Sequence, residues 1–119
     1  MKGVLKVAKP KKTTRIKNEK SRLFEIFADL EPNKLDTCRA LIDRAAFLTI
    51  SLQDLEELLN ENGWVEPYKN GSNQEGFKPS AAANVHVSLT KNLNSIMKLL
   101  LDLVPPAKRR SKLDELMNS

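Results

Sequence analysis

The feature that most constrains the fold is a helix signal over residues 80–103 that is marked at both ends. Ser80 suits the N-cap position, because its hydroxyl can accept a hydrogen bond from an unpaired amide in the first turn. Pro105 and Pro106 have no amide hydrogen and stop the helix. In between, apolar residues recur at intervals of three and four: Ala82, Val85, Leu89, Leu93, Ile96, Leu100 and Leu103. A helix of about 24 residues is roughly 36 Å long, so this stripe needs a second long helix to cover it.

The other side of the 80–103 helix is polar throughout. It carries Asn84, Ser88, Lys91, Ser95, Lys98 and Asp102. We expect the apolar stripe to pack and this polar stripe to meet water or a charged partner. Lys91 and Lys98 are therefore candidate contacts for a polyanion, and the alternative is a solvated helix face without a partner.

The second long helix is expected over residues 33–62. Pro32 suits the first turn, where a missing amide hydrogen costs nothing, and Asn62-Gly63 offers a left-handed stop. Thr49 to Ser51 weaken the helix propensity, so the alternative is a break there that would give a helix-turn-helix. Cys38 is expected to be a small buried apolar residue. It belongs to a near three-four repeat: Leu35, Cys38, Leu41, Ile42, Ala45, Leu48, Leu52, Leu55, Leu58 and Leu59.

Shorter helices are expected on both sides of this pair. One runs from residue 17 to the residues before Pro32, with its apolar side chains at Leu23, Phe24, Ile26, Phe27 and Leu30. Another spans 107–117 and brings Leu113, Leu116 and Met117 together.

The 64–79 connector between the long helices is rich in Gly, Asn and Pro. Asn70-Gly71 favours positive backbone angles and is able to close a small β-hairpin between 65–68 and Phe77. The predicted fold class is therefore all-α: an antiparallel pair of long helices with short flanking helices and room for a small hairpin in the connector.

Composition limits the classes of protein to which the chain can belong. The 119 residues suit one domain, and only 5% of them are aromatic, which favours helical packing over a sandwich or barrel. One cysteine and one histidine exclude an intrachain disulfide and disfavour a structural zinc site, so no metal and no cofactor is expected. No apolar run of about 18 residues and no cleavable apolar leader is present. We therefore expect a soluble, intracellular protein that has no membrane partner.

The net charge of +5 is concentrated at the two ends of the chain. Residues 1–20 hold eight Lys or Arg against one Glu, and residues 104–119 hold four against two acids, whereas the body between them is acidic. We divide the chain into a disordered basic arm (1–16), a helical core and oligomerisation domain (17–106) and a C-terminal segment (107–119). The arm points to a polyanion, and the alternative is a solubilising tail. The candidate DNA contacts are Lys2, Lys6, Lys9, Lys11, Lys12, Arg15, Lys17 and Lys20, together with Lys91 and Lys98.

No pattern of residues indicates catalysis. The glycines do not form a phosphate-binding loop, and His86 has neither a neighbouring cysteine nor a serine elbow, so a packed or surface histidine is expected. Most carboxylates lie three or four residues from a cation, as Asp43 does from Arg39, which is typical of a solvated helix face. We therefore expect a protein that is not an enzyme.

Three short segments, taken in order, resemble the small subunit of tailed-phage terminases. They are Asn62-Gly63-Trp64-Val65 at the end of the first long helix, Lys78-Pro79-Ser80-Ala81 at the start of the second, and the run from Asp102 through Pro105-Pro106 to Arg110. The resemblance covers about residues 20–113. The chain departs from the family pattern at Asp102, where a glycine is usual, and at Lys108, where an arginine is usual.

The resemblance implies a non-catalytic, ring-forming factor that recognises double-stranded viral DNA in the host cell cytoplasm. A ring of about nine subunits is expected. The family's small subunits act with a separate large subunit, which carries the ATPase and nuclease activities and is regulated by the small subunit. By analogy, the C-terminal segment would dock on that large subunit through Lys108, Arg109, Arg110, Leu113 and Leu116.

Two other classes of function stay open at this point. A helix-turn-helix transcriptional regulator would read DNA with residues 35–62, but that region is acidic and would repel phosphates. Its polar and acidic residues are Gln53, Asp54, Glu56, Glu57 and Glu61. The other alternative is a helical scaffold protein that does not bind nucleic acid.

Overall fold

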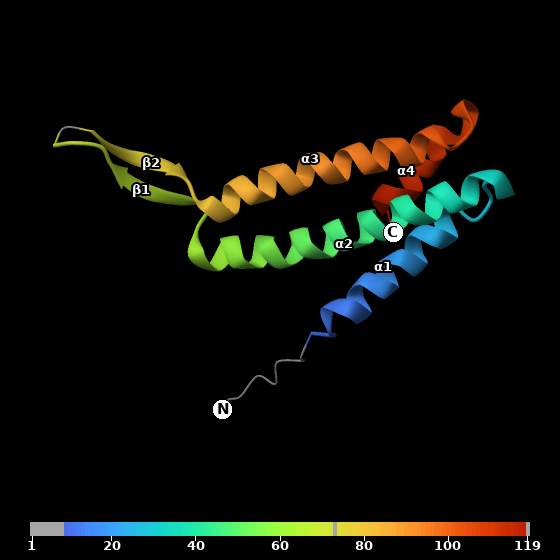
Figure 1. The fold of residues 1–119 in the computed structure, drawn as a ribbon, viewed down its shortest axis with the longest axis horizontal. Helices are drawn as coiled ribbons and strands as arrows, with labels where there is room; N and C mark the ends of the chain where they lie inside the picture. Colours follow the sequence, from blue (N-terminus) through green and yellow to red (C-terminus); the bar gives the residue numbers. More distant parts are fainter. Residues whose placement is uncertain (1–8, 73, 119) are drawn as a thin grey trace.

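A computed structural model describes residues 9–72 and 74–118 of the chain. Over this part it is mainly helical, with a small antiparallel hairpin inserted between the two long helices (Figure 1). The elements in chain order are α1 (Lys12–Ile26), α2 (Pro32–Asn62), β1 (Val65–Lys69), β2 (Glu75–Pro79), α3 (Ala81–Asp102), the 3-10 turn η1 (Pro106–Lys108) and α4 (Arg109–Asn118).

Helix α2 runs without interruption from Pro32 to Asn62, so the predicted alternative of a break is wrong. Pro32 occupies the first turn, and Gly63 ends the helix with a φ of 101° while its amide donates to the Leu59 carbonyl at 2.7 Å. The apolar stripe keeps its helical spacing through residues 49–51, and its packing outweighs the low helix propensity of these residues. The hydroxyls of Thr49 and Ser51 are buried there without a hydrogen-bond partner in the part of the chain that the structure describes.

Helix α3 begins and ends where its local signals predict. The Ser80 hydroxyl accepts a hydrogen bond from the Ala83 amide at 3.1 Å, which confirms the N-cap. At the other end, Lys34 Nζ donates to the Leu103 carbonyl at 3.3 Å and the Arg109 guanidinium donates to the Val104 carbonyl at 3.0 Å. Cations therefore satisfy carbonyl groups that have no partner within the helix.

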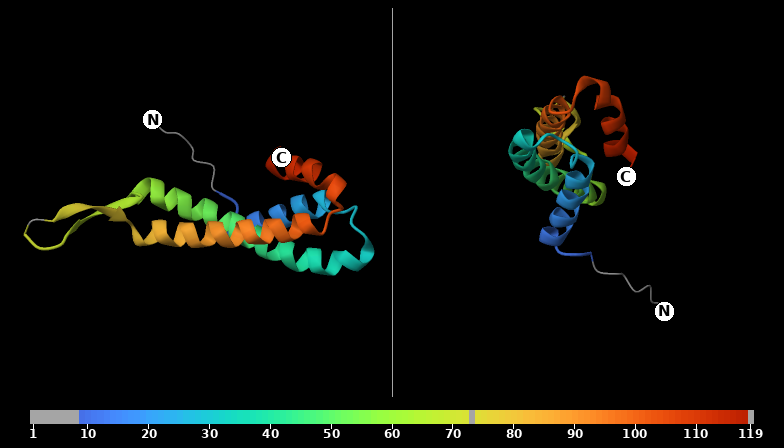
Figure 2. Two further views of the ribbon diagram at one scale, coloured as in Figure 1. Left: turned by 90° about the horizontal axis from the view of Figure 1, so that it is seen from above. Right: turned by 90° about the vertical axis from the view of Figure 1, so that its right-hand side faces the viewer.

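The connector forms the small hairpin that the sequence allowed, with Val65 opposite Pro79 and Lys69 opposite Glu75. It projects beyond the ends of α2 and α3 (Figures 1 and 2). Gly71 has a φ of 78° in its turn, and a side chain at Gly76 would meet the Tyr68 ring at 3.0 Å.

Helix α1 begins at Lys12 rather than at residue 17, so the last part of the predicted disordered arm is helical. The early start has a physical reason, because Lys12 and Arg15 on the first turns gain contacts with α2. Residues 1–8 of the predicted arm lie outside the described residues.

The core lies where α1, α2 and the C-terminal end of α3 converge, away from the hairpin. Leu23, Phe27, Ile42 and Leu100 are almost completely shielded from solvent, and Cys38 is buried beside them as predicted. Burial raises the pKa of the Cys38 thiol, which favours the unreactive protonated form. None of the helices in the described ranges is long and apolar enough to cross a membrane.

Candidate nucleic-acid interface

Six of the predicted DNA-contacting cations lie within one short stretch of the chain, residues 9–20, which we call the basic segment. These cations are Lys9, Lys11, Lys12, Arg15, Lys17 and Lys20. The stretch contains the first part of α1, which packs against α2. Lys2 and Lys6 lie outside the described residues.

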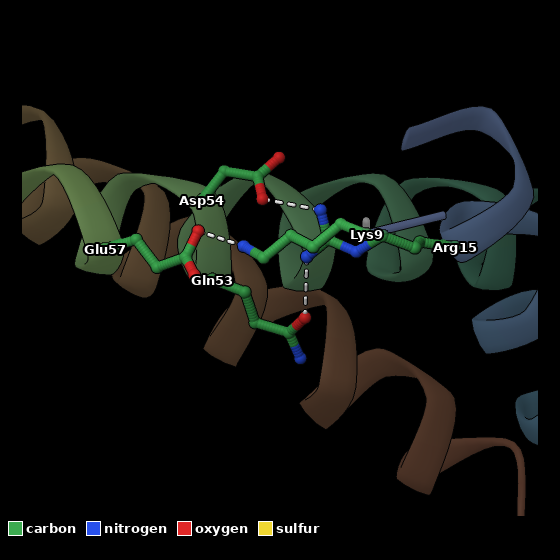
Figure 3. A network of polar contacts seen from close by, with 5 residues as sticks. All are labelled: Lys9, Arg15, Gln53, Asp54 and Glu57. Carbon is green, nitrogen blue, oxygen red and sulfur yellow. Dashed lines mark hydrogen bonds and ion pairs between the residues drawn. The ribbon is translucent and has the colours of Figure 1, made fainter. Parts of the chain in front are cut away.

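Arg15 anchors the basic segment to α2. Its Nη1 contacts Asp54 Oδ1 at 2.6 Å and its Nη2 donates to Gln53 Oε1 at 3.1 Å (Figure 3). Lys9 pairs with Glu57 one turn further along the same helix. The three acceptors belong to the acidic part of α2, and its two carboxylates, Asp54 and Glu57, neutralise cations of the chain itself.

A third ion pair continues this contact toward the middle of α2. Lys20 Nζ lies 3.3 Å from Asp43 Oδ1, so Asp43 pairs with α1 and the predicted pair with Arg39 is not the one formed. Both partners are more than a third exposed. An exposed pair of this kind contributes roughly 0.2–1 kcal/mol and weakens as salt rises.

Two arginines that sequence reasoning did not include lie beside the basic segment. The Lys12 ammonium and the Arg44 guanidinium both lie over the half-exposed Phe47 ring, at 5.1 and 5.6 Å from its centroid. Arg39 lies 5.9 Å from the centroid of Phe24 on α1. The spacing of Arg44 and Phe47 was visible in the sequence, but the approach of Lys12 depends on how α1 docks.

Lys11 and Lys17 complete the basic segment. Both are exposed, and neither makes an ion pair with another described residue. They are therefore the members of the segment that a polyanion could reach without displacing an internal contact.

The polar stripe of α3 forms a separate surface. All six of its predicted residues are exposed, including Lys91 and Lys98. In Figure 1, α2 lies between α3 and the first turns of α1, so the structure does not bring these two lysines together with the basic segment.

The C-terminal segment folds back onto the body of the chain (Figure 2). Of the predicted docking residues, Lys108, Arg110 and Leu113 are exposed, Arg109 caps α3, and Leu116 packs against the core. Leu113, Leu116 and Met117 share one side of α4 at helical spacing, but only Leu116 of the three packs against the core, while Leu113 and Met117 are exposed.

The residue that α4 buries is instead Lys112, which is 8% exposed. Its Nζ lies 2.8 Å from Asp29 Oδ1 and 3.6 Å from Glu115 Oε2, and it donates to the Ile26 carbonyl at 2.5 Å. Burial on its own would lower the pKa of Lys112, but the hydrogen bond to Asp29 and the two carboxylate charges raise it overall. The same hydrogen bond is the main reason that the pKa of Asp29 is lowered.

His86 lies at the base of the hairpin. Its Nε2 is 2.8 Å from Glu56 Oε2, and its ring meets the Trp64 ring edge-on with centroids 5.0 Å apart. These contacts join α2 to α3, as expected of a packed histidine. Within the described ranges, no three His, Cys, Asp or Glu side chains gather closely enough to hold a metal ion.

Comparison with known proteins finds no match: no family model, no curated protein and no solved structure is similar enough to place the chain in a family.

Proposed function

We propose that the chain is the DNA-binding, non-catalytic small subunit of a tailed-phage terminase, acting in the host cytoplasm with a large subunit that carries the ATPase and nuclease. The proposal joins the sequence resemblance to one structural observation. Residues 9–20 carry six cations where α1 packs on α2, while Arg44 and Arg39 lie over the neighbouring rings of Phe47 and Phe24. A dense group of cations of this kind favours binding to phosphates.

Backbone contact is the mode of DNA binding that these residues favour. Lysines are flexible point charges without the planar fork that pairs with guanine, so they carry little base readout. Engaging six phosphates would give a slope of log affinity against log salt of about −5. The proposed contact is therefore strongly dependent on salt and only weakly dependent on sequence.

Assembly into a ring is the second part of the proposal, and a stripe on α3 supports it. Val85, Leu89 and Leu99 lie on one side of the helix at 3.6 residues per turn, next to Ile96, which packs against the core. Val85 and Leu99 are about half exposed, at 50% and 52%. An apolar strip of this length on a soluble chain fits a head-to-tail contact with a neighbouring copy, which closes a ring.

Docking on the large subunit is the third part, and it rests on fewer residues than the sequence alone indicated. Lys108, Arg110 and Leu113 are exposed and available to a partner. Arg109 and Leu116 make contacts within the chain, so they would hold the exposed residues in position and would not contact the partner themselves. The helix-turn-helix alternative loses its basis, because α2 has no turn within residues 35–62.

The mass in solution tests the assembly. We expect the wild-type chain to form a closed oligomer larger than a dimer, and Val85→Glu with Leu99→Glu to dissociate it while the helical content stays. Val87→Glu is the matched control, because Val87 is equally exposed, at 51%, but lies on another side of α3. A wild-type chain that is monomeric at micromolar concentration would contradict the ring.

A titration with duplex DNA tests the binding surface. Lys11→Ala with Lys17→Ala and Lys91→Ala with Lys98→Ala each remove two exposed lysines, so the two variants are matched in charge. We expect the first pair to lower the affinity about tenfold or more at low salt and to reduce the salt slope by about 2. We expect a smaller effect from the second pair. No DNA binding by the wild-type chain would support the scaffold alternative.

A further inference from the structure

We propose that the acidic face of α2 is an intramolecular docking surface for the basic segment, and that DNA must displace the segment from this face in order to bind. The acidic face consists of Asp43, Asp54 and Glu57, with Gln53 beside them. The inference rests on the proposed DNA binding, since it assigns a regulation to the same cations.

The contacts that carry the inference recur along α2 and involve charges of opposite sign. Asp54 and Gln53 hold Arg15, Glu57 holds Lys9, and Asp43 holds Lys20 (Figure 3 shows the first two). The acceptors span about fourteen residues of one helix, which is roughly 21 Å of its length. The partners also follow one another in order: Lys9, Arg15 and Lys20 along the segment pair with Glu57, Asp54 and Asp43 along α2. A chance ion pair would not produce such an ordered series.

The groups involved are those that DNA itself would use. Carboxylates present oxygen acceptors to guanidinium and ammonium groups, as phosphates do, so the acidic face occupies Lys9, Arg15 and Lys20 in place of DNA. Lys11 and Lys17 stay exposed. The segment therefore offers two free lysines for a first encounter, while three cations become available only when their internal contacts open.

The exposure of the acids makes the contact reversible. The Asp43, Asp54 and Glu57 side chains are 51%, 36% and 58% exposed, so each carboxylate can return to water when its partner leaves. An internal contact of this kind lowers the apparent DNA affinity by the fraction of chains in which the segment is free. It favours a long polyanion, which replaces all three partners at once, over an isolated phosphate.

The test compares two triple variants of the full chain in binding to a duplex of mixed sequence. The first, Asp43→Asn with Asp54→Asn and Glu57→Gln, removes the acidic face. The second, Asp36→Asn with Asp114→Asn and Glu61→Gln, makes the same change of charge at exposed acids that hold no cation of the basic segment. Helical content and unfolding temperature are recorded for both, so that each is compared as a folded protein.

We expect the first variant to bind DNA on the order of tenfold more tightly than the second at about 50 mM salt, with the difference shrinking toward about 200 mM as screening weakens the internal pairs. Equal affinity of the two variants would overturn the competition. Absence of DNA binding by the wild-type chain and both variants would overturn the proposed function as well.

A second measurement tests the docking without DNA. A double-mutant cycle with Arg15→Ala and Asp54→Asn, followed by chemical unfolding, reports whether the two side chains stabilise one another in solution. A favourable coupling that falls as salt rises supports the docking. A coupling of zero at low salt would overturn it, whatever the DNA titration gives.

Discussion

The two ends of the chain are both basic, but they hold their cations in different ways. The basic segment lays Lys9, Arg15 and Lys20 on the surface of α2, where the carboxylate partners are a third or more exposed. The C-terminal helix α4 buries Lys112 among Asp29, Glu115 and a backbone carbonyl. The Lys112 side chain is less exposed than those of the three cations of the basic segment, at 10% against 16–51%, and it also holds a backbone carbonyl, so its contacts are replaced by water less readily.

Net charge alone therefore does not locate a binding site. Both ends carry an excess of cations, so by composition each is a candidate anion site. The environment of each cation separates them: the basic segment can release its cations to a polyanion, and α4 uses its most buried cation to attach itself to α1. We expect substitutions at the two ends to differ in the size of the stability loss and in how strongly salt changes it.

The largest effect on stability is expected from Lys112→Ala. This change leaves the Ile26 carbonyl without its donor, removes the ion pairs with Asp29 and Glu115, and opens a gap under α4, which should cost about 2 kcal/mol in the free energy of unfolding. Urea unfolding measures the loss, and hydrogen exchange over residues 109–118 should show that α4 detaches first.

Lys108→Ala is the control for this change, since it removes an exposed lysine from the same segment. It should alter the free energy of unfolding by less than about 0.5 kcal/mol. Equal effects from the two substitutions would show that Lys112 is not held as the structure has it.

The attachment of α4 should depend on pH in both directions. The lowered pKa of Asp29 means that its contribution is present above the ordinary aspartate value of about 3.9 and is lost as the pH falls through the lower folded value. The raised pKa of Lys112 means that its contribution is present below about 10.4 and is lost as the pH rises through the higher folded value.

Protection of the 109–118 amides should therefore be greatest between these limits and decline on either side, once the intrinsic exchange rates are corrected for pH. Because Asp29 is 53% exposed, solvent screening keeps the acid effect to a few tenths of a kcal/mol. Asp29→Asn should remove the acid decline and also weaken the alkaline one, because Asp29 is the main group that raises the pKa of Lys112 against burial. An acid decline that persists in this variant would show that another group causes it.

The smallest effect on stability is expected from Arg15→Ala in the basic segment. Its guanidinium is only partly buried, so we expect a loss of roughly 0.5–1 kcal/mol at low salt that shrinks as salt is added. Unfolding at two salt concentrations measures it. A loss as large as that of Lys112→Ala, or one that salt does not change, would remove the distinction between the two ends.

Local signals in the sequence predicted most of the helical framework. Ser80, Gly63 and the prolines at 32 and 105 act through backbone geometry within a turn, and the apolar repeats fix which sides of α2 and α3 pack. The hairpin followed from Asn70-Gly71 for the same reason. These features depend on neighbours in the chain.

The parts that could not be predicted depend on groups far apart in the sequence. The start of α1 at Lys12 requires acceptors about forty residues away, and the burial of Lys112 requires Asp29 and the end of α1 to meet α4. No spacing within either segment carries that information. The candidate site was therefore predicted as a set of cations, but their partners and their availability were not.

DNA binding by the two basic ends, measured across salt concentrations, tests the central claim most directly. Lys11→Ala with Lys17→Ala removes two exposed cations from the basic segment, and Lys108→Ala with Arg110→Ala removes two from the C-terminal segment. We predict that the first pair lowers the affinity about tenfold or more and reduces the salt slope by about 2, while the second changes the affinity by less than about twofold. The opposite order, with the C-terminal pair dominant and the basic segment without effect, would contradict the assignment of DNA binding to residues 9–20.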